Sequence, residues 1–153
     1  MPIIAPQSVL DKMPDDLKSR TTVLANGESK SVSDILDGGC GPRLQYHPDR
    51  LTKHPKGRDN GYVLTFGATR VYVAGDTEDT PEMRALTGID VAFLPMNLPY
   101  TMDVEHAADA VKAFGPTIVF PVSLRPERRA EIQGAGRRCE RCAAAEVVLI
   151  RRT

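Results

Sequence analysis

A carboxylate at the end of a strand is the residue in this sequence best placed for chemistry. Asp76 follows Gly75 directly after Val-Tyr-Val-Ala at 71–74, a β-branched and aromatic run. Ligand sites in α/β proteins form beyond the carboxyl ends of strands, and a carboxylate is a hard oxygen ligand that can bridge two metal ions. Because Asp is also a routine turn residue, capping of the turn or of the following helix is the alternative interpretation.

Three other groups of residues are weaker candidates. Asn97 and Tyr100 lie in a loop after a buried strand, at the same expected sheet edge, where they would shape a substrate pocket or simply form a turn. His106 falls on the polar face of a predicted helix, which favours a surface role. Cys139 and Cys142 have the spacing of a metal knuckle or a redox pair, but no second pair follows, so coincidence is favoured.

The elements expected to position these residues form a layered unit over residues 61–122. Residues 62–66 and 70–74 are strand-forming runs joined at Gly67-Ala68, which predicts a hairpin. Residues 89–95 and 117–122 read as buried strands. Helices are expected at 81–86 and at 101–114, with Thr101 as the cap of the second. The predicted fold class is therefore α/β (α+β), a mixed sheet with helices on one face.

The remaining segments flank this unit within a single domain, 1–153. Residues 1–35 predict a strand, a helix that Pro14 splits, and a hairpin with its turn at Asn26-Gly27. Glycines, prolines and charges leave no periodicity over 36–60, which predicts an irregular loop. The tail over 123–153 has only weak periodicity.

Composition narrows the class of protein. The 153 residues suit one compact domain, and 20 basic against 20 acidic side chains argue against a nucleic-acid or membrane-surface binder. The balance hides an asymmetry, because eight Arg and only four Glu lie within residues 125–153. No apolar run of about 18 residues could span a membrane. No secretory signal is visible either, so a cytoplasmic protein is expected.

Several segments of the unit resemble one family. They are Asn-Gly-Tyr-Val-Leu at 60–64, Arg-Val-Tyr-Val-Ala-Gly-Asp-Thr at 70–77, Ile-Asp-Val-Ala-Phe-Leu-Pro at 89–95, and Thr-Met at 101–102 before Ala-Ala-Asp-Ala-Val at 107–111. Together they resemble the C-terminal half of the metallo-β-lactamase fold, an αβ/βα sandwich. The most similar branch is that of L-ascorbate-6-phosphate-lactonase-like, Zn-dependent hydrolases. The resemblance covers residues 60–121 and extends more weakly through 2–6 and 24–28.

The resemblance implies roles for particular residues. It makes Asp76 a metal ligand and zinc or manganese the cofactor. The segment His-Pro-Lys-Gly at 54–57 also resembles the family. It would place His54 at the mouth of the active site, with a solvated loop histidine as the alternative.

Other parts of the family's metal site are missing from the sequence. His47, His54 and His106 do not form the family's His-x-His-x-Asp-His motif, and Ser123-Leu124 stands where a closing His-Tyr is expected. Catalytic zinc takes about three protein ligands and an open position for water. One carboxylate is too few, so a lone chain is expected to bind metal weakly or not at all.

A change of reading frame would explain these departures. If residues 123–125 were encoded TCA CTA CGN, a shift of one base would read CAC TAC, which is His-Tyr. The same shift over residues 39–46 can read Ala-Val-Ala-Pro-Ala-Tyr-Asn-Thr, and Pro-Ala-Tyr-Asn resembles the family. We therefore hypothesise that residues 38–46 and those from Ser123 onward are frameshifted remnants, which would also account for the Arg-rich tail.

Two functions follow as expectations. The first is a metal-dependent hydrolase of ester, lactone or phosphoester type, truncated or degenerate and inactive as a lone chain, with a small-molecule substrate if active. The second is a non-catalytic module that binds itself or a complementary N-terminal half, because an uncovered sheet face would expose a large apolar patch. Both predict self-association, probed by molecular mass in solution.

Overall fold

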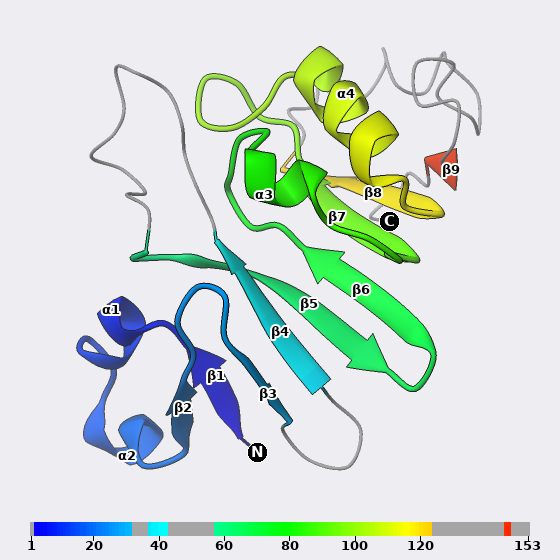
Figure 1. Ribbon diagram of the computed structural model, residues 1–153. Helices are drawn as coiled ribbons and strands as arrows, with labels where there is room; N and C mark the ends of the chain where they lie inside the picture. Colours follow the sequence, from blue (N-terminus) through cyan, green and yellow to red (C-terminus); the bar gives the residue numbers. More distant parts are fainter. Residues whose placement is uncertain (1, 32–36, 43–56, 124–145, 148–153) are drawn as a thin grey trace, which may run out of the picture.

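The computed structural model describes residues 2–31, 37–42, 57–123 and 146–147 (Figure 1). These residues form a two-stranded sheet of order β1-β2 and a seven-stranded sheet of order β3-β4-β5-β6-β7-β8-β9. The strands are β1 (Ile3–Ala5), β2 (Thr21–Val23), β3 (Ser29–Ser31), β4 (Asp37–Pro42), β5 (Asn60–Phe66), β6 (Thr69–Val73), β7 (Val91–Pro95), β8 (Ile118–Val122) and β9 (Glu146–Val147). The helices are α1 (Gln7–Leu10), α2 (Asp15–Lys18), α3 (Pro81–Arg84) and α4 (Val104–Phe114).

The large sheet is mixed, as predicted. Pairing is antiparallel from β3 to β6 and parallel from β6 to β9. The hairpin predicted at Gly67-Ala68 is confirmed, because Phe66 pairs with Thr69 and Gly67 takes a φ of +60°, which glycine adopts without steric cost. The two apolar runs form strands β7 and β8, as predicted, but β8 is not buried throughout, because only Val119 of its five residues is buried.

Helices α3 and α4 lie over one face of this sheet (Figure 1), which confirms the predicted layering. The side chains that α4 buries include Ala107, Val111 and Phe114, at the spacing of one helix face. They join a cluster with every second residue of the strands beneath, such as Tyr72 and Leu94. The core therefore sits between the sheet and these two helices.

Capping of α4 differs from the expectation for Thr101. The N-cap is Asp103, whose carboxylate accepts a hydrogen bond from the backbone N–H of His106 at 2.7 Å. Thr101 is only 3% exposed, and its hydroxyl instead accepts from the backbone N–H of Asn97 at 2.8 Å. Both residues can cap a helix, and the loop before α4 uses the threonine to close itself.

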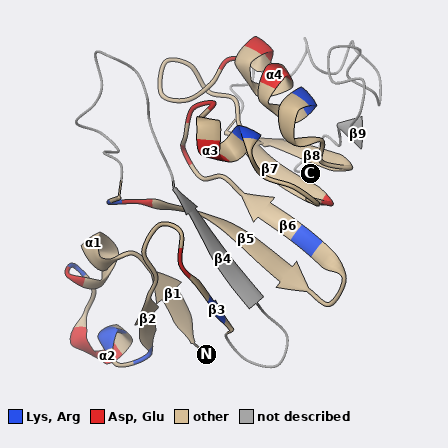
Figure 2. Cartoon of the chain, viewed as in Figure 1, with Lys and Arg blue, Asp and Glu red and all other residues tan. Residues whose placement is uncertain are grey.

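The opposite face of the sheet carries apolar side chains that are half-buried. Cross-strand pairing aligns them in two rows, Leu64-Val71-Val91-Ile118 and Tyr62-Val73-Phe93-Phe120. Phe93 and Phe120 stack with ring centroids 5.1 Å apart. Figure 2 shows the charged residues of the described part mainly on helices and loops, with β5, β7 and β8 free of them.

The hairpin predicted within residues 1–35 is wrong. A turn does close at Asn26-Gly27, where the N–H of Glu28 donates to the carbonyl of Ala25 at 3.1 Å. However, β2 pairs in parallel with β1, across a connection that contains α1 and α2, and β3 pairs with β4 in the other sheet. The strands on either side of the turn therefore enter different sheets, while Pro14 separates α1 from α2 as expected.

The irregular loop predicted over 36–60 is wrong for Asp37–Pro42, which forms β4, and Asn60 opens β5. The six residues of β4 pair in register with β5, from Asp37 opposite Thr65 to Pro42 opposite Asn60. Ladder hydrogen bonds to a neighbouring strand override the poor strand propensity of glycine and proline. Residues 36 and 43–56 of that segment and nearly all of the 123–153 tail lie outside the described residues. Within the described part of the chain, no helix is long and apolar enough to cross a membrane.

Candidate functional site

The ends of strands β6, β7 and β8 and the start of β5 lie at one edge of the large sheet. Tyr62 near the start of β5 pairs with Val73 at the end of β6, Val73 pairs with Phe93, and Pro95 pairs with Val122. The carboxyl ends of β6, β7 and β8 therefore lie beside the beginning of β5 (Figure 1). This is the type of edge at which α/β folds build ligand sites.

Asp76 lies in the loop that leaves this edge after β6. Gly75 before it takes a φ of +68°, a left-handed conformation that favours glycine and turns the chain away from the sheet. Asp76 is exposed, whereas the next residue, Thr77, is 1% exposed and donates its hydroxyl to the carbonyl of Glu78 at 3.1 Å. The loop thus buries Thr77 and keeps Asp76 at the surface.

The alternative role of Asp76 as a helix cap is wrong. The N-cap of α3 is Thr80, whose hydroxyl accepts from the backbone N–H of Met83 at 3.1 Å. Pro81 occupies the first helical position, as predicted, where its missing N–H costs little. The role of Asp76 as a metal ligand stays a prediction.

An ion pair fixes the end of the same loop. The guanidinium of Arg84 in α3 donates from Nε to both carboxylate oxygens of Asp79, at 2.8 and 3.1 Å, and also from Nη2 to Oδ2. The hydrogen bond to Asp79 is the main reason that the pKa of Arg84 is raised. Sequence analysis missed this pair, although an acidic residue just before a short helix that ends in Arg is a usable signal.

Asn97 and Tyr100 lie at the same edge, in the loop that follows β7. The N–H of Met96 donates to the carbonyl of Val122 at 3.1 Å, which ties the start of this loop to the end of β8. The N–H groups of Tyr100 and Thr101 both donate to the carbonyl of Asn97, at 2.9 and 3.0 Å. The loop is therefore a closed turn, with Asn97 partly buried and Tyr100 58% exposed. Their predicted part in a substrate pocket is untested.

Asn60 and Gly61, at the start of β5, connect this edge to the N-terminal segment. Asn60 is 6% exposed; its amide nitrogen donates to the carbonyl of Leu24 and its oxygen accepts from the Asn26 side chain, both at 2.7 Å. A Cβ on Gly61 would lie 3.1 Å from the carbonyl oxygen of Ala74, so glycine allows β6 to approach. Sequence analysis assigned Asn60 no role beyond its motif, because hydrogen-bond partners distant in the chain leave no local signal.

The histidines do not join Asp76 in the described structure. His54 and His47 lie outside the described residues, as do Cys139 and Cys142. His106 is exposed on α4, with its ring Nδ1 3.0 Å from a carboxylate oxygen of Asp103, which agrees with a surface role. Residues 2–31, 37–42, 57–123 and 146–147 contain no group of three His, Cys, Asp or Glu side chains able to hold a metal ion. These residues by themselves do not fit a catalytic metal, which needs about three protein ligands.

Comparison with known protein families and curated proteins shows which proteins this chain is similar to. A family described as "Beta-lactamase superfamily domain" matches residues 4–123. Among curated proteins, the UPF0173 metal-dependent hydrolase of Symbiobacterium thermophilum is 35% identical over 99 residues, which cover 60% of this chain and 44% of that protein. The corresponding protein of Thermoplasma acidophilum is 41% identical over 69 residues, 43% of this chain and 30% of its own.

Solved structures give the same result. A protein of Parabacteroides distasonis, named as a metal-dependent hydrolase, superposes with a TM-score of 0.83 at 38% identity, covering 97% of this chain and 63% of that one. Igni18, a metallo hydrolase of Ignicoccus hospitalis, superposes with a TM-score of 0.76 at 23% identity, over 97% of this chain and 65% of its own, which shows the fold alone.

The chain spans less than two thirds of the length of each of these relatives. Its family match is nevertheless broad, since it runs from residue 4 to residue 123. The chain belongs to the metallo-β-lactamase superfamily, with metal-dependent hydrolases among its relatives.

Proposed function

We propose that this chain is a hydrolase scaffold that contributes one metal-binding carboxylate, Asp76, and is inactive as a lone polypeptide. The observation that supports it is the position of Asp76, exposed after β6 at an edge where the described residues bring no set of ligands together. A single carboxylate binds a divalent ion weakly, since zinc sites take about three protein ligands. Truncation or degeneration of an active ancestor would produce this arrangement.

The activity of the complete site is metal-assisted hydrolysis of an ester, lactone or phosphoester, with zinc or manganese as the metal. The lactonase-like branch is part of this proposal, based on the motifs at 60–64, 70–77 and 89–95. In such a site the partly buried Asn97 and the exposed Tyr100 would border a small-molecule substrate at the edge that Asp76 shares. Histidines from another polypeptide or from outside the described residues would have to complete it.

Metal content and activity test the proposal together. The purified chain, dialysed against Zn²⁺ or Mn²⁺ and desalted, should retain far less than about one ion per chain. It should hydrolyse p-nitrophenyl esters, bis-p-nitrophenyl phosphate and a γ-lactone no faster than buffer. Stoichiometric metal together with turnover that Asp76→Asn abolishes would overturn the claim of inactivity.

The role of Asp76 itself needs a separate measurement. Dilute Mn²⁺ should broaden the amide resonances of residues 75–77 in a ¹⁵N-labelled sample, and Asp76→Asn should remove that broadening. The control is Asp15→Asn, which neutralises an exposed carboxylate on α2 that pairs with Lys18 at 3.0 Å. Broadening that is unchanged in Asp76→Asn would show that the carboxylate binds no metal.

A second candidate function is a non-catalytic module that associates with itself. It is favoured by the apolar face formed by the rows Leu64-Val71-Val91-Ile118 and Tyr62-Val73-Phe93-Phe120, opposite α3 and α4. Buried interface cores are depleted in charge, and these rows contain none. Light scattering should give a mass above that of one chain, and Phe120→Asp should lower it. A single-chain mass for a well-folded sample would contradict self-association.

A further inference from the structure

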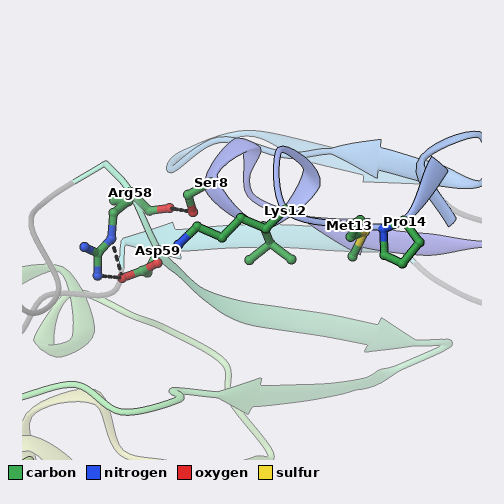
Figure 3. A pocket seen from close by; sticks show the side chains of 7 residues that line it. Ser8, Lys12, Met13, Pro14, Arg58 and Asp59 are labelled. Carbon is green, nitrogen blue, oxygen red and sulfur yellow. Dashed lines mark hydrogen bonds and ion pairs between the residues drawn. The ribbon is translucent and has the colours of Figure 1, made fainter.

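A hollow that Asp76 does not line lies between α1 and the segment that enters β5 (Figure 3). Its volume is about 400 Å³, within the range of small-molecule pockets in proteins. One wall comes from α1 and the turn into α2, and the other from Arg58 and Asp59. The hydroxyl of Ser8 donates to the carbonyl of Arg58 at 2.9 Å and closes one end between the two walls.

One part of this hollow is apolar. Val9, Met13 and Pro14 line it, and Val9 remains 40% exposed although it is a large hydrophobic residue. Apolar surface that is removed from water contributes roughly 25 cal/mol per Å². A ligand with an aliphatic or aromatic body would therefore gain from covering these side chains.

The other part is charged, and its described lining residues are two cations, Lys12 and Arg58, and one anion, Asp59. Arg58 and Asp59 neutralise each other, because Nε and Nη2 of Arg58 both donate to Oδ2 of Asp59, at 3.1 and 2.8 Å. Lys12 extends toward this pair from the turn that follows α1 (Figure 3). Within the described part of the chain Lys12 takes part in no ion pair and no side-chain hydrogen bond. Its ammonium group is thus the charge that the hollow offers to a ligand.

We propose that this hollow binds a small organic monoanion, with its carboxylate against Lys12 and its apolar body against Val9, Met13 and Pro14. A single negative charge matches the Lys12 ammonium, which has no side-chain partner within the described part of the chain. A doubly charged phosphate is a poorer match, because the Asp59 carboxylate, only 16% exposed, stands at the same end and repels the second charge. The proposal is independent of the metal chemistry proposed for Asp76.

Sodium hexanoate is the probe, titrated into the ¹⁵N-labelled full chain with hexanamide as its uncharged counterpart. The expected result is saturable shifts of the amide resonances of Ser8, Val9, Lys12 and Met13, with hexanamide binding at least about threefold more weakly. Exposed ion pairs are worth up to about a fivefold change in affinity. Equal binding of the two probes would refute the role of the charge, and the absence of saturable shifts would refute the site.

Two variants and one control locate the interaction. Lys12→Gln should weaken hexanoate about three- to fivefold and leave hexanamide unchanged, while Val9→Ser should weaken both probes. Lys18→Gln is the control, because Lys18 lies on α2 and does not line the hollow. All three side chains are on the surface or partly exposed, so circular dichroism spectra should match that of the parent chain. Equal effects of Lys12→Gln and Lys18→Gln would show a general charge effect and overturn the proposal.

Discussion

Replacement of Asn60 by Ala tests whether one buried amide joins the N-terminal segment to the large sheet. Asn60 is 6% exposed at the start of β5, while its partners Leu24 and Asn26 belong to the segment after β2. The substitution keeps a residue that strands tolerate and removes only the amide. Its effect therefore reports the hydrogen bonds rather than the backbone.

The expected loss in the free energy of unfolding depends on which polar groups lose a hydrogen-bond partner in Asn60→Ala. Two strong bonds of 2.7 Å disappear, whereas the contact from the Asn60 amide to the Tyr62 hydroxyl is long, at 3.4 Å. The carbonyl of Leu24 is left without this donor in a residue that is 2% exposed. A net hydrogen bond is worth about 1 kcal/mol, and a buried polar group left unpaired costs about 1–3 kcal/mol. Asn60→Ala should lower the free energy of unfolding by about 3 kcal/mol.

Urea denaturation followed by circular dichroism measures this loss. The control is Thr69→Ala at the exposed start of β6, expected within about 0.5 kcal/mol of the parent. Asn26→Ala should cost about 2 kcal/mol, because it removes two hydrogen bonds, to the side-chain oxygen of Asn60 at 2.7 Å and to the carbonyl of Asp59 at 3.1 Å. The double variant should lose less than the sum of the single ones, by about 1 kcal/mol. A loss below about 1 kcal/mol for Asn60→Ala, or strict additivity, would refute the reasoning.

Three further changes test the packing and capping around the site. Phe114→Ala empties a position that is 5% exposed in the core and should cost about 3–5 kcal/mol in urea denaturation; less than about 1 kcal/mol would contradict that core. Asp103→Ala removes the cap on the N–H of His106 and should cost about 1 kcal/mol, read from the midpoint of thermal unfolding, with no change if the cap is unimportant. Gly61→Ala places a Cβ 3.1 Å from the carbonyl oxygen of Ala74 and should lower the free energy of unfolding by about 1–3 kcal/mol. It should also shift the amide resonances of residues 74–76, and an unchanged spectrum would show that β5 and β6 leave space for the Cβ.

The parts of the fold that the sequence predicts well are those in which local and global preferences agree. β5 and β6 combine β-branched residues with a two-residue glycine turn, and α4 has an apolar face at helical spacing with Gly115 at φ +57° as its end. For these elements the pattern of the residues and the burial in the structure point to the same answer.

The parts that sequence reasoning misses are decided by partners distant in the chain. Asn26-Gly27 does make a tight turn, but β2 finds its partner in β1 and β3 finds its partner in β4. No local pattern distinguishes a hairpin from a turn that connects two sheets. A partner outside the helix also decides which residue caps α4. Thr101 and Asp103 are both good capping residues, but the Thr101 hydroxyl accepts a hydrogen bond from the N–H of Asn97, and Asp103 is the N-cap.

For the candidate site, the sequence predicts where the residues lie better than what they bind. Asp76 follows a strand and Asn97 follows its parallel neighbour, so their shared edge is a consequence of strand direction. The support of the loop by Asp79 and Arg84 depends on side-chain geometry, which spacing alone does not specify. Ligation depends on groups brought together from distant segments, and the described residues contain no group of three such side chains.

β4 is the strand whose residues are least suited to a strand. The nucleotide sequence of the gene can show whether these residues derive from another reading frame. Asp-Gly-Gly-Cys-Gly-Pro at 37–42 has almost no strand propensity, yet it pairs with β5 over six residues and with β3 over three. The family match runs through this segment and stops at residue 123, where Ser123 takes a φ of +59°, a conformation uncommon outside glycine. We propose that both segments derive from a strand and a His-Tyr end read in another frame. Codons that give Pro-Ala-Tyr-Asn near residues 42–45 and His-Tyr near residues 123–124 in a shifted frame are expected, and codons that give neither refute the proposal.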